Sequence, residues 1–184
     1  MRTELLDIPG GVVLHLDRQD DERGTFVKPF QRSLYEGLGM DADVAEFYWS
    51  TSGQGVIRGL HFQLPPHAHA KTVAILAGSI ADVVLDLRAD SPTFRQHRLL
   101  TLDSQTPAAV HVPTGCAHGF QALSASATVG YLVGTEYAPE HDAGVRWDSA
   151  GIAWPLDPTA VSERDASFPG LGEFVTPFTL QGAA

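Results

Sequence analysis

Ile80-Ala81-Asp82-Val83-Val84-Leu85-Asp86-Leu87-Arg88 is the stretch that decides the fold of this chain. In a β-strand, successive side chains point to opposite faces, so the even and odd positions form two separate faces. The even positions carry Asp82, Asp86 and Arg88 beside two aliphatic residues, whereas the odd positions are all aliphatic. One face is therefore mixed polar and the other apolar, as expected for a barrel whose interior holds a ligand.

Similar short β-rich stretches recur along the chain, separated by turn signals such as Pro9-Gly10-Gly11 and Pro65-Pro66. Many short, evenly spaced strands are typical of an all-β sandwich or barrel. We predict only two short helices, at residues 33–38 and 158–165, and an irregular tail from Phe168. The predicted strands span residues 12–16, 26–30, 44–50, 72–76, 80–87, 98–102, 109–112 and 127–132.

Size and composition limit the functions that are open to the chain. With 184 residues, 43% of them hydrophobic, it can bury one good core, so we predict a single domain over residues 1–184. The net charge of −10 argues against binding to nucleic acid or to an anionic membrane. The chain has no long apolar run and no secretory signal, and the single cysteine, Cys116, excludes an intramolecular disulfide. We therefore expect a cytoplasmic protein.

Ionisable residues interrupt several of the apolar stretches. His61 lies in Arg58-Gly59-Leu60-His61-Phe62-Gln63, Lys71 opens an apolar run, and His118 and Tyr131 have apolar neighbours. Burying such groups costs several kcal/mol unless they are paired, so their repetition favours a reaction chamber over a plain core. Each also has an ordinary explanation, because His61 can bond a carbonyl, Lys71 can extend to solvent and Tyr131 can pack in a core. Together they supply a base, an acid and an oxyanion partner, which favours an enzyme.

The alternation also predicts how the site must be built. Arg58 and His61 would lie on opposite faces of a regular strand, so a shared site requires an irregularity between them. Gly59 is the natural position for a bulge. Tyr131 and Tyr137 share parity, so a continuous strand would point both to one side.

Pro113-x-Gly115-x-x-His118 matches the second half of the cupin signature. The first half requires His-x-His followed by a nearby Glu. His67-Ala68-His69 supplies the histidines, but Val73 and Ala74 stand where the carboxylate belongs. We therefore expect no bound metal, and expect His67 and His69 on a solvated loop. A metal-dependent cupin is the alternative that metal analysis of the purified protein would decide.

Longer motifs occur in order over nearly the whole chain, with Lys71 and Tyr131 between them: Asp21-Glu22-Arg23-Gly24-x-Phe26, Gly55-Val56-Ile57-Arg58-Gly59-Leu60-His61-Phe62-Gln63, Asp82-Val83-Val84-Leu85-Asp86-Leu87-Arg88, Ser91-Pro92-Thr93-Phe94, Ala117-His118-Gly119-Phe120 and Ile152-x-Trp154-Pro155. Together they resemble the dTDP-4-dehydrorhamnose 3,5-epimerase family. The resemblance implies a cupin-type jelly-roll β-barrel and an isomerase that acts on a nucleoside-diphosphate 4-keto-6-deoxyhexose without a metal or organic cofactor. It also implies a homodimer in which an N-terminal strand crosses to the partner.

The resemblance further implies a role for each candidate residue. His61 matches the base that removes a proton beside the C4 ketone, and Asp165 matches its dyad partner. Tyr131 matches the acid that returns a proton from the opposite face, and Lys71 matches a residue near the C4 oxygen. The candidates for substrate binding are Arg58 at the phosphates, His118 in the sugar pocket, Arg23 and Phe26 at the nucleotide end, and Lys28, Glu46, Tyr48, Gln63 and Tyr137. Taken alone, Asp165 is equally explained as a surface charge at a helix end.

The chemistry requires these residue types on physical grounds as well. Removing a proton alpha to a ketone leaves an enolate, which a hydrogen bond from an ammonium or imidazole group stabilises. Inversion needs a base on one face and a proton donor on the other, and an imidazole suits the base near neutral pH. A bidentate arginine suits a diphosphate.

Lys28, Glu46 and Tyr48 depart from the family pattern, which usually has Glu, Gln and Asn at these positions, and Arg95 replaces a usual Gly. A carboxylate at position 46 disfavours a nearby diphosphate unless Arg58 or Lys28 neutralises it. A change from Glu to Lys replaces a hydrogen-bond acceptor by a donor. Thymine and cytosine differ in the same way at N3, which is a donor in thymine and an acceptor in cytosine. The carrier nucleotide, dTDP or another such as CDP, and the number of inverted centres therefore stay open. A non-catalytic cupin that binds a sugar nucleotide is the alternative from another class.

Overall fold

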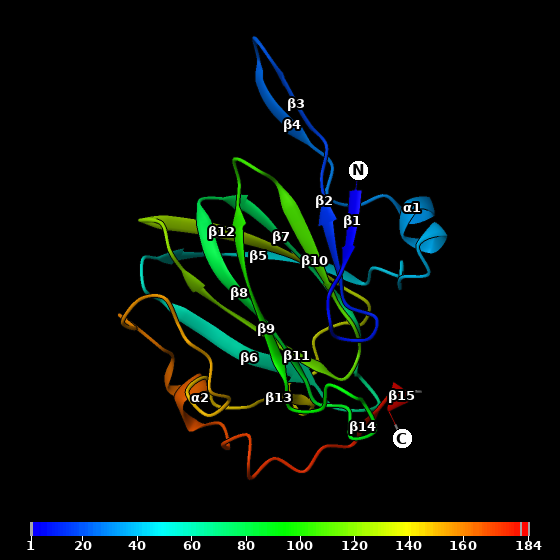
Figure 1. Ribbon diagram of the computed structural model, residues 1–184, viewed down its shortest axis with the longest axis vertical. Coiled ribbons are helices and arrows are strands. Elements are labelled where there is room, and N and C mark those ends of the chain that lie inside the picture. The colour runs from blue at the N-terminus through cyan, green and yellow to red at the C-terminus, as the bar shows by residue number, and fades with distance from the viewer. Residues whose placement is uncertain (1, 181, 184) are drawn as a thin grey trace.

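The computed structural model describes residues 2–180 and 182–183, which form two antiparallel sheets packed face to face (Figure 1). The larger sheet contains β1 (Arg2–Leu5), β2 (Val12–His15), β10 (Ala108–Val112), β7 (Lys71–Ala77), β12 (Ser126–Val133) and β5 (Glu46–Gly53), in this order. The smaller sheet contains β13 (Asp142–Gly144), β6 (Ile57–Gln63), β11 (Cys116–Ala122), β8 (Ser79–Asp86) and β9 (His97–Asp103). This architecture confirms the predicted all-β fold, a jelly roll of cupin type.

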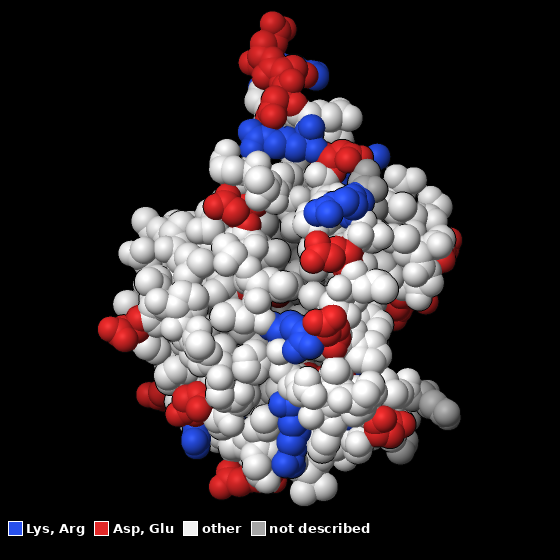
Figure 2. Space-filling model, viewed as in Figure 1, with Lys and Arg blue, Asp and Glu red and all other residues white. Residues whose placement is uncertain are grey.

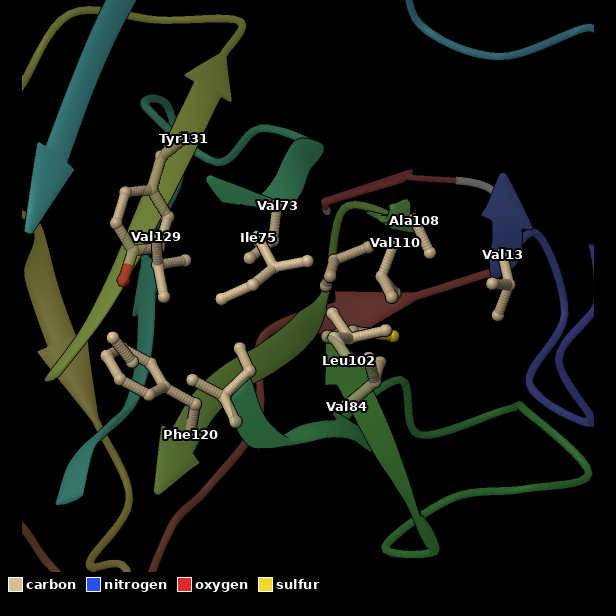
Figure 3. Packing of buried hydrophobic residues seen from close by; sticks show 14 of the residues in the cluster. Val13, Val73, Ile75, Val84, Leu102, Ala108, Val110, Phe120, Val129 and Tyr131 are labelled. Carbon is tan, nitrogen blue, oxygen red and sulfur yellow. The ribbon is translucent and has the colours of Figure 1, made fainter. Parts of the chain in front are cut away.

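The main hydrophobic core lies between the two sheets, where Val73 and Ile75 of the larger sheet meet Val84 and Phe120 of the smaller one (Figure 3). Val84 belongs to the even positions of the stretch 80–88, so the mixed face of β8 does point into the interior. Here β-branched side chains fill the space between sheets, as their propensity for strands favours.

The apolar face of β8 is buried on the outside of the sandwich. Val83 and Leu85 of β8, and Leu87 just after the strand, pack in a second cluster with Val145, Leu171 and Phe178. The C-terminal segment therefore covers the outer face of the smaller sheet. On the other side of the molecule, a third cluster joins β2 to Tyr35 of α1 (Arg32–Gly37).

The prediction of a helix over residues 158–165 was wrong in its bounds. Helix α2 (Glu163–Ser167) begins only after Ser162, whose side-chain oxygen accepts a hydrogen bond from Asp165 N. The residues before Ser162 are not helical, and Ala160 instead forms an isolated parallel bridge with Val56. The other predicted helix is confirmed by α1, with a shift of one residue at each end. None of the helices in the described part of the chain is long and apolar enough to cross a membrane.

Several strands differ from the prediction. The expected strand over residues 26–30 ends earlier, because β4 (Gly24–Val27) forms a hairpin with β3 (Arg18–Asp21) and Pro29 leads into α1. The hairpin projects away from the sandwich (Figure 1). The tail from Phe168 is irregular, as predicted, except for the short pair of β14 (Phe178–Thr179) and β15 (Gly182–Ala183).

The predicted irregularity at Gly59 is confirmed. On β11, His118 pairs with His61 but Phe120 pairs with Arg58, so the register shifts by one residue between the two pairs. Gly59 has a φ of 126°, and a Cβ atom there would lie 2.5 Å from Gly119 Cα. Only glycine suits this conformation and this close approach. The shift turns Arg58 and His61 toward the same pocket.

Candidate active site

A pocket of about 840 Å³ opens between the two sheets near α2. The walls come from β5, β6, β7, β11, β12 and the segment that leads into α2. Most of the residues that the sequence singled out line this pocket, although they are far apart in the chain: Glu46, Tyr48, Arg58, His61, Gln63, Lys71, His118, Tyr131, Tyr137 and Asp165. The fold therefore brings a base, an ammonium, a phenol and a carboxylate into one space.

His61 and Asp165 form a hydrogen-bonded pair, with Nε2 of the imidazole 2.8 Å from Oδ1 of the carboxylate. The other oxygen, Oδ2, accepts a hydrogen bond of 2.9 Å from the backbone amide of Gly59. The carboxylate is thus held by the same irregular turn of β6 that presents His61. The predicted contact between these two distant residues is confirmed. Because Asp165 accepts the Nε2 proton, Nδ1 of His61 keeps its lone pair and can take up another proton.

The surroundings keep His61 neutral and Asp165 charged at neutral pH. Burial lowers the pKa of His61 below its ordinary value, the Asp165 hydrogen bond acts in the opposite direction, and Arg164 and Lys71 lower it further. For Asp165, burial opposes the charged form, but the hydrogen bonds from His61 and Gly59 lower its pKa to about 2. The result is an unprotonated imidazole oriented by a carboxylate, which is the form that a general base needs.

Lys71 is buried beside His61, and its Nζ donates a hydrogen bond of 3.1 Å to the His61 carbonyl. Burial lowers the pKa of Lys71 to about 8, although Asp142 and Asp82 favour its charged form. At neutral pH the side chain is still mostly protonated. A cation in such a buried position stabilises developing negative charge more strongly than it would in water.

Tyr131 extends into the space between the sheets (Figure 3). Its hydroxyl lies 3.2 Å from Ser50 Oγ, and its ring stacks on Tyr48 with 4.8 Å between ring centres. Burial raises the pKa of Tyr131 and also that of Tyr48, to about 12 for Tyr48. Both phenols therefore stay protonated, and Tyr131 can act as a proton donor.

His118 belongs to a second histidine–carboxylate pair, on the strand next to His61. Its Nε2 lies 2.6 Å from Asp82 Oδ1, and both side chains are buried. The second oxygen, Asp82 Oδ2, has no hydrogen-bond partner within the described residues. Asp82 was not among the candidate site residues, although its place as a charged residue on the inward face of the stretch 80–88 was a signal for it.

Gln63 and Glu46 hold the loop that follows β12. Gln63 Oε1 accepts a hydrogen bond of 2.7 Å from Ala138 N, and Glu46 Oε1 accepts one of 3.1 Å from Tyr137 N. The continuous strand that would point Tyr131 and Tyr137 to one side does not form, because β12 ends at Val133. Tyr137 reaches the pocket from the loop instead.

The histidines of His67-Ala68-His69 are half-buried, so the prediction of a solvated loop was wrong. Nδ1 of His69 lies 2.7 Å from Thr135 Oγ1, and the ring lines the pocket. Burial lowers the pKa of His69 to about 4, so this imidazole is neutral at physiological pH.

Three candidates, Arg23, Phe26 and Lys28, are not among the described residues that line the pocket. Arg23 and Phe26 belong to the projecting hairpin and Lys28 follows it, and all three side chains are exposed. Figure 2 shows acidic side chains gathered at the tip of this hairpin, where Arg23 pairs with Asp21. Within one chain, the hairpin and the pocket are separate.

Sequence reasoning also missed Arg164, Asp142 and Ser50, which line the pocket. Arg164 precedes Asp165 on α2 and could have been suspected from that position. Asp142 lies in a segment whose sequence pattern does not distinguish it from a surface loop.

Comparison with known proteins identifies the family. The sequence profile of the family described as dTDP-4-dehydrorhamnose 3,5-epimerase matches residues 5–173. A relative from Sinorhizobium fredii with the name dTDP-4-dehydrorhamnose 3,5-epimerase is 39% identical over 162 residues, which are 86% of this chain and 83% of the relative.

Solved structures agree with this relationship. NovW, a 4-keto-6-deoxy sugar epimerase from Streptomyces spheroides, superimposes with a TM-score of 0.89 at 34% identity, over 94% of this chain and 88% of NovW. RmlC from Legionella pneumophila, solved in complex with dTDP-4-keto-L-rhamnose, has a TM-score of 0.89 at 32% identity, over 95% of this chain and 94% of that protein. This chain is therefore a carbohydrate epimerase and belongs to the dTDP-4-dehydrorhamnose 3,5-epimerase family.

Proposed function

We propose that the enzyme inverts C3, C5 or both in a nucleoside-diphosphate 4-keto-6-deoxyhexose, with His61 as the base and Tyr131 as the acid. The observation that carries this proposal is the His61 imidazole, held 2.8 Å from Asp165 in the same pocket as the Tyr131 phenol. The relative from Legionella pneumophila, whose structure holds dTDP-4-keto-L-rhamnose, supports the substrate class.

In this mechanism, Nδ1 of His61 takes the proton from the carbon beside the C4 ketone. The electron pair of the broken C–H bond moves to the C4 oxygen, where the Lys71 ammonium stabilises the enolate. Tyr131 then donates its hydroxyl proton to the same carbon from the opposite face, and the C4 ketone forms again. The imidazolium and the phenolate return to their starting forms by proton exchange with solvent, so the reaction needs no redox partner.

Arg58 is suited to bind the diphosphate at the rim of the pocket. Its Nε donates a hydrogen bond of 2.9 Å to Ser52 Oγ, which fixes the direction of the side chain. The guanidinium keeps further N–H groups for phosphate oxygens, and such charge-assisted bonds are among the strongest hydrogen bonds in proteins.

We infer that the protein acts as a homodimer in which the β3–β4 hairpin reaches the pocket of the partner. This would bring Arg23, Phe26 and Lys28 to the nucleotide end of a site that lacks them within one chain. Two further features support a dimer: Phe26 is 58% exposed, and the outer face of β5 exposes Phe47 (53%) and Trp49 (65%). Analytical ultracentrifugation should show a dimer, and a monomer with full activity would contradict this arrangement.

The proposed function is tested by incubating the enzyme in D2O with dTDP- and CDP-4-keto-6-deoxyglucose. NMR should show deuterium at C3, C5 or both, together with an inverted product, because each inversion passes through an enolate that takes its new proton from exchangeable groups. Binding without any exchange would instead support a non-catalytic cupin.

A cytoplasmic location remains our prediction, supported by the single, buried cysteine, Cys116.

We predict that the preferred carrier nucleotide differs from dTDP. The carboxylate of Glu46 and the phenol of Tyr48 line the pocket, where the family pattern has neutral amides. A site with altered hydrogen-bond donors and acceptors discriminates strongly between nucleotides, since a mismatched ligand leaves buried polar groups unpaired. Calorimetry at one ionic strength should rank dTDP, CDP, UDP and GDP. A clear preference for dTDP that Lys28→Glu leaves unchanged would disprove this prediction.

A further inference from the structure

Arg164 lies between two carboxylates at the edge of the pocket. Its Nη1 donates a hydrogen bond of 2.8 Å to Asp142 Oδ2, and its Nε lies 3.3 Å from Asp165 Oδ1. That same Oδ1 accepts the hydrogen bond from His61. Arg164 and the proposed base therefore share one oxygen atom of the proposed dyad.

The contacts of Arg164 also fasten the short helix that carries Asp165. Helix α2 has only five residues, and a helix of this length is not stable without tertiary contacts. The Gly59 amide ties Asp165 to β6, while Arg164 ties the helix to Asp142 on β13. The Asp142 side chain is only 14% exposed, so the pair with Arg164 is partly shielded from solvent.

We propose that Arg164 is a positioning residue for the His61–Asp165 pair, which anchors α2 and places a positive charge that keeps the imidazole unprotonated. The Arg164 charge disfavours the protonated form of His61 in two ways. It repels the proton on an imidazolium directly, and it weakens the pull of the Asp165 carboxylate by occupying one of its oxygens. The inference rests on the proposed role of His61 as the base, but the effect on the ionisation of His61 does not depend on activity.

The other charges around His61 come from every neighbouring element. The charged or titratable groups near it are Asp165 on α2, Asp142 on β13, Lys71 on β7, His118 on β11 with Asp82 on β8, Tyr131 on β12, Arg58 on β6 and His69 before β7. Burial, Arg164 and Lys71 lower the pKa of His61, whereas Asp165 favours the imidazolium. Of these two cations, Arg164 is the one that can be changed without removing a residue with a proposed chemical role.

The test is an NMR titration of the histidine side chains in isotope-labelled protein, with His61 assigned by its loss in His61→Ala. Arg164→Gln removes the charge and keeps an N–H donor near the position of Nε, on a shorter side chain. We expect the pKa of His61 to rise by about half to one pH unit, less than for a fully buried charge because Arg164 is half exposed. Arg164→Lys keeps the charge and should leave the pKa close to that of the wild type.

Arg146→Gln is the matched control. Arg146 pairs with Asp148 at 2.6 Å and has a side chain 42% exposed, against 48% for Arg164, but it does not belong to the described lining of the pocket. This variant should leave the pKa of His61 unchanged. In Arg164→Gln, the acidic limb of the pH profile of kcat/KM should move to higher pH by the same amount as the NMR titration.

The sign of the shift decides the inference. An unchanged pKa of His61 in Arg164→Gln, or an equal rise in Arg164→Lys, would overturn the proposed role of the charge. A fall would overturn the role of the charge and leave only the anchoring role of Arg164, since it would mean that α2 had detached and taken Asp165 away from the imidazole. If the pKa rises as expected but the wild type exchanges no sugar proton, the inference stands and the proposed function fails.

Discussion

His61→Ala is expected to lower the rate of proton exchange beside the sugar ketone by about 10²- to 10⁴-fold, the usual contribution of a general base. The reason is that His61 combines an unprotonated nitrogen with Asp165, a carboxylate at 2.8 Å that orients the imidazole. The exchange rate in D2O, measured by NMR on the substrate, gives the effect directly, because it reports removal of the α-proton without requiring product formation.

The fold should survive this change. The His61 side chain is 28% exposed, so its loss leaves no closed cavity in the core. Thermal unfolding and nucleotide binding of the variant should stay close to the wild type. His15→Ala, which removes an exposed histidine paired with Glu4, serves as the control and should keep full exchange. Exchange near the wild-type rate in His61→Ala would show that another group is the base.

Tyr131→Phe should separate the two halves of the reaction. The variant keeps the ring that stacks on Tyr48 but loses the hydroxyl that lies 3.2 Å from Ser50 Oγ. His61 can still remove the α-proton, so part of the exchange should remain. The inverted product should fall by about 10²-fold or more, because the proton donor on the opposite face is missing.

The ratio of the two rates is the informative quantity for Tyr131. Deuterium incorporation with retained configuration should exceed inversion in Tyr131→Phe, whereas inversion accompanies exchange in the wild type. If both rates fall by the same factor, Tyr131 is not specifically the acid. Ser50→Ala is a milder control, which loses the partner of the phenol but keeps the proton donor.

The fold was predictable where local pattern and tertiary structure agree. The alternation of residues 80–88 gave the two faces of β8 correctly, and Gly59 marked the irregularity that turns Arg58 and His61 to one side. The prediction of residues 158–165 as one helix failed, because Ala160 forms a bridge with Val56 instead of entering the helix. Such a contact joins residues far apart in the chain and leaves no periodic signal.

The catalytic residue types of the site were predictable, but some contacts between distant residues were not. The motifs around His61 and Tyr131 identified residues that do share one pocket. The contact of Arg164 with Asp142 was not predictable, since neither residue belongs to a motif and their spacing carries no structural signal. The binding position of the β3–β4 hairpin was not predictable from the sequence pattern either, because the proposed position lies on a second chain.

The most direct test of the account is a crystal structure of the enzyme with an unreactive nucleoside-diphosphate hexose. We predict that the sugar lies in the pocket between the two proposed proton-transfer groups, with a ring carbon next to C4 facing His61 Nδ1 and the opposite face of that carbon toward Tyr131. The oxygen on C4 should lie within hydrogen-bond reach of Lys71 Nζ. A sugar that binds with both neighbouring carbons beyond the reach of His61, or with His61 and Tyr131 on the same face, would contradict it.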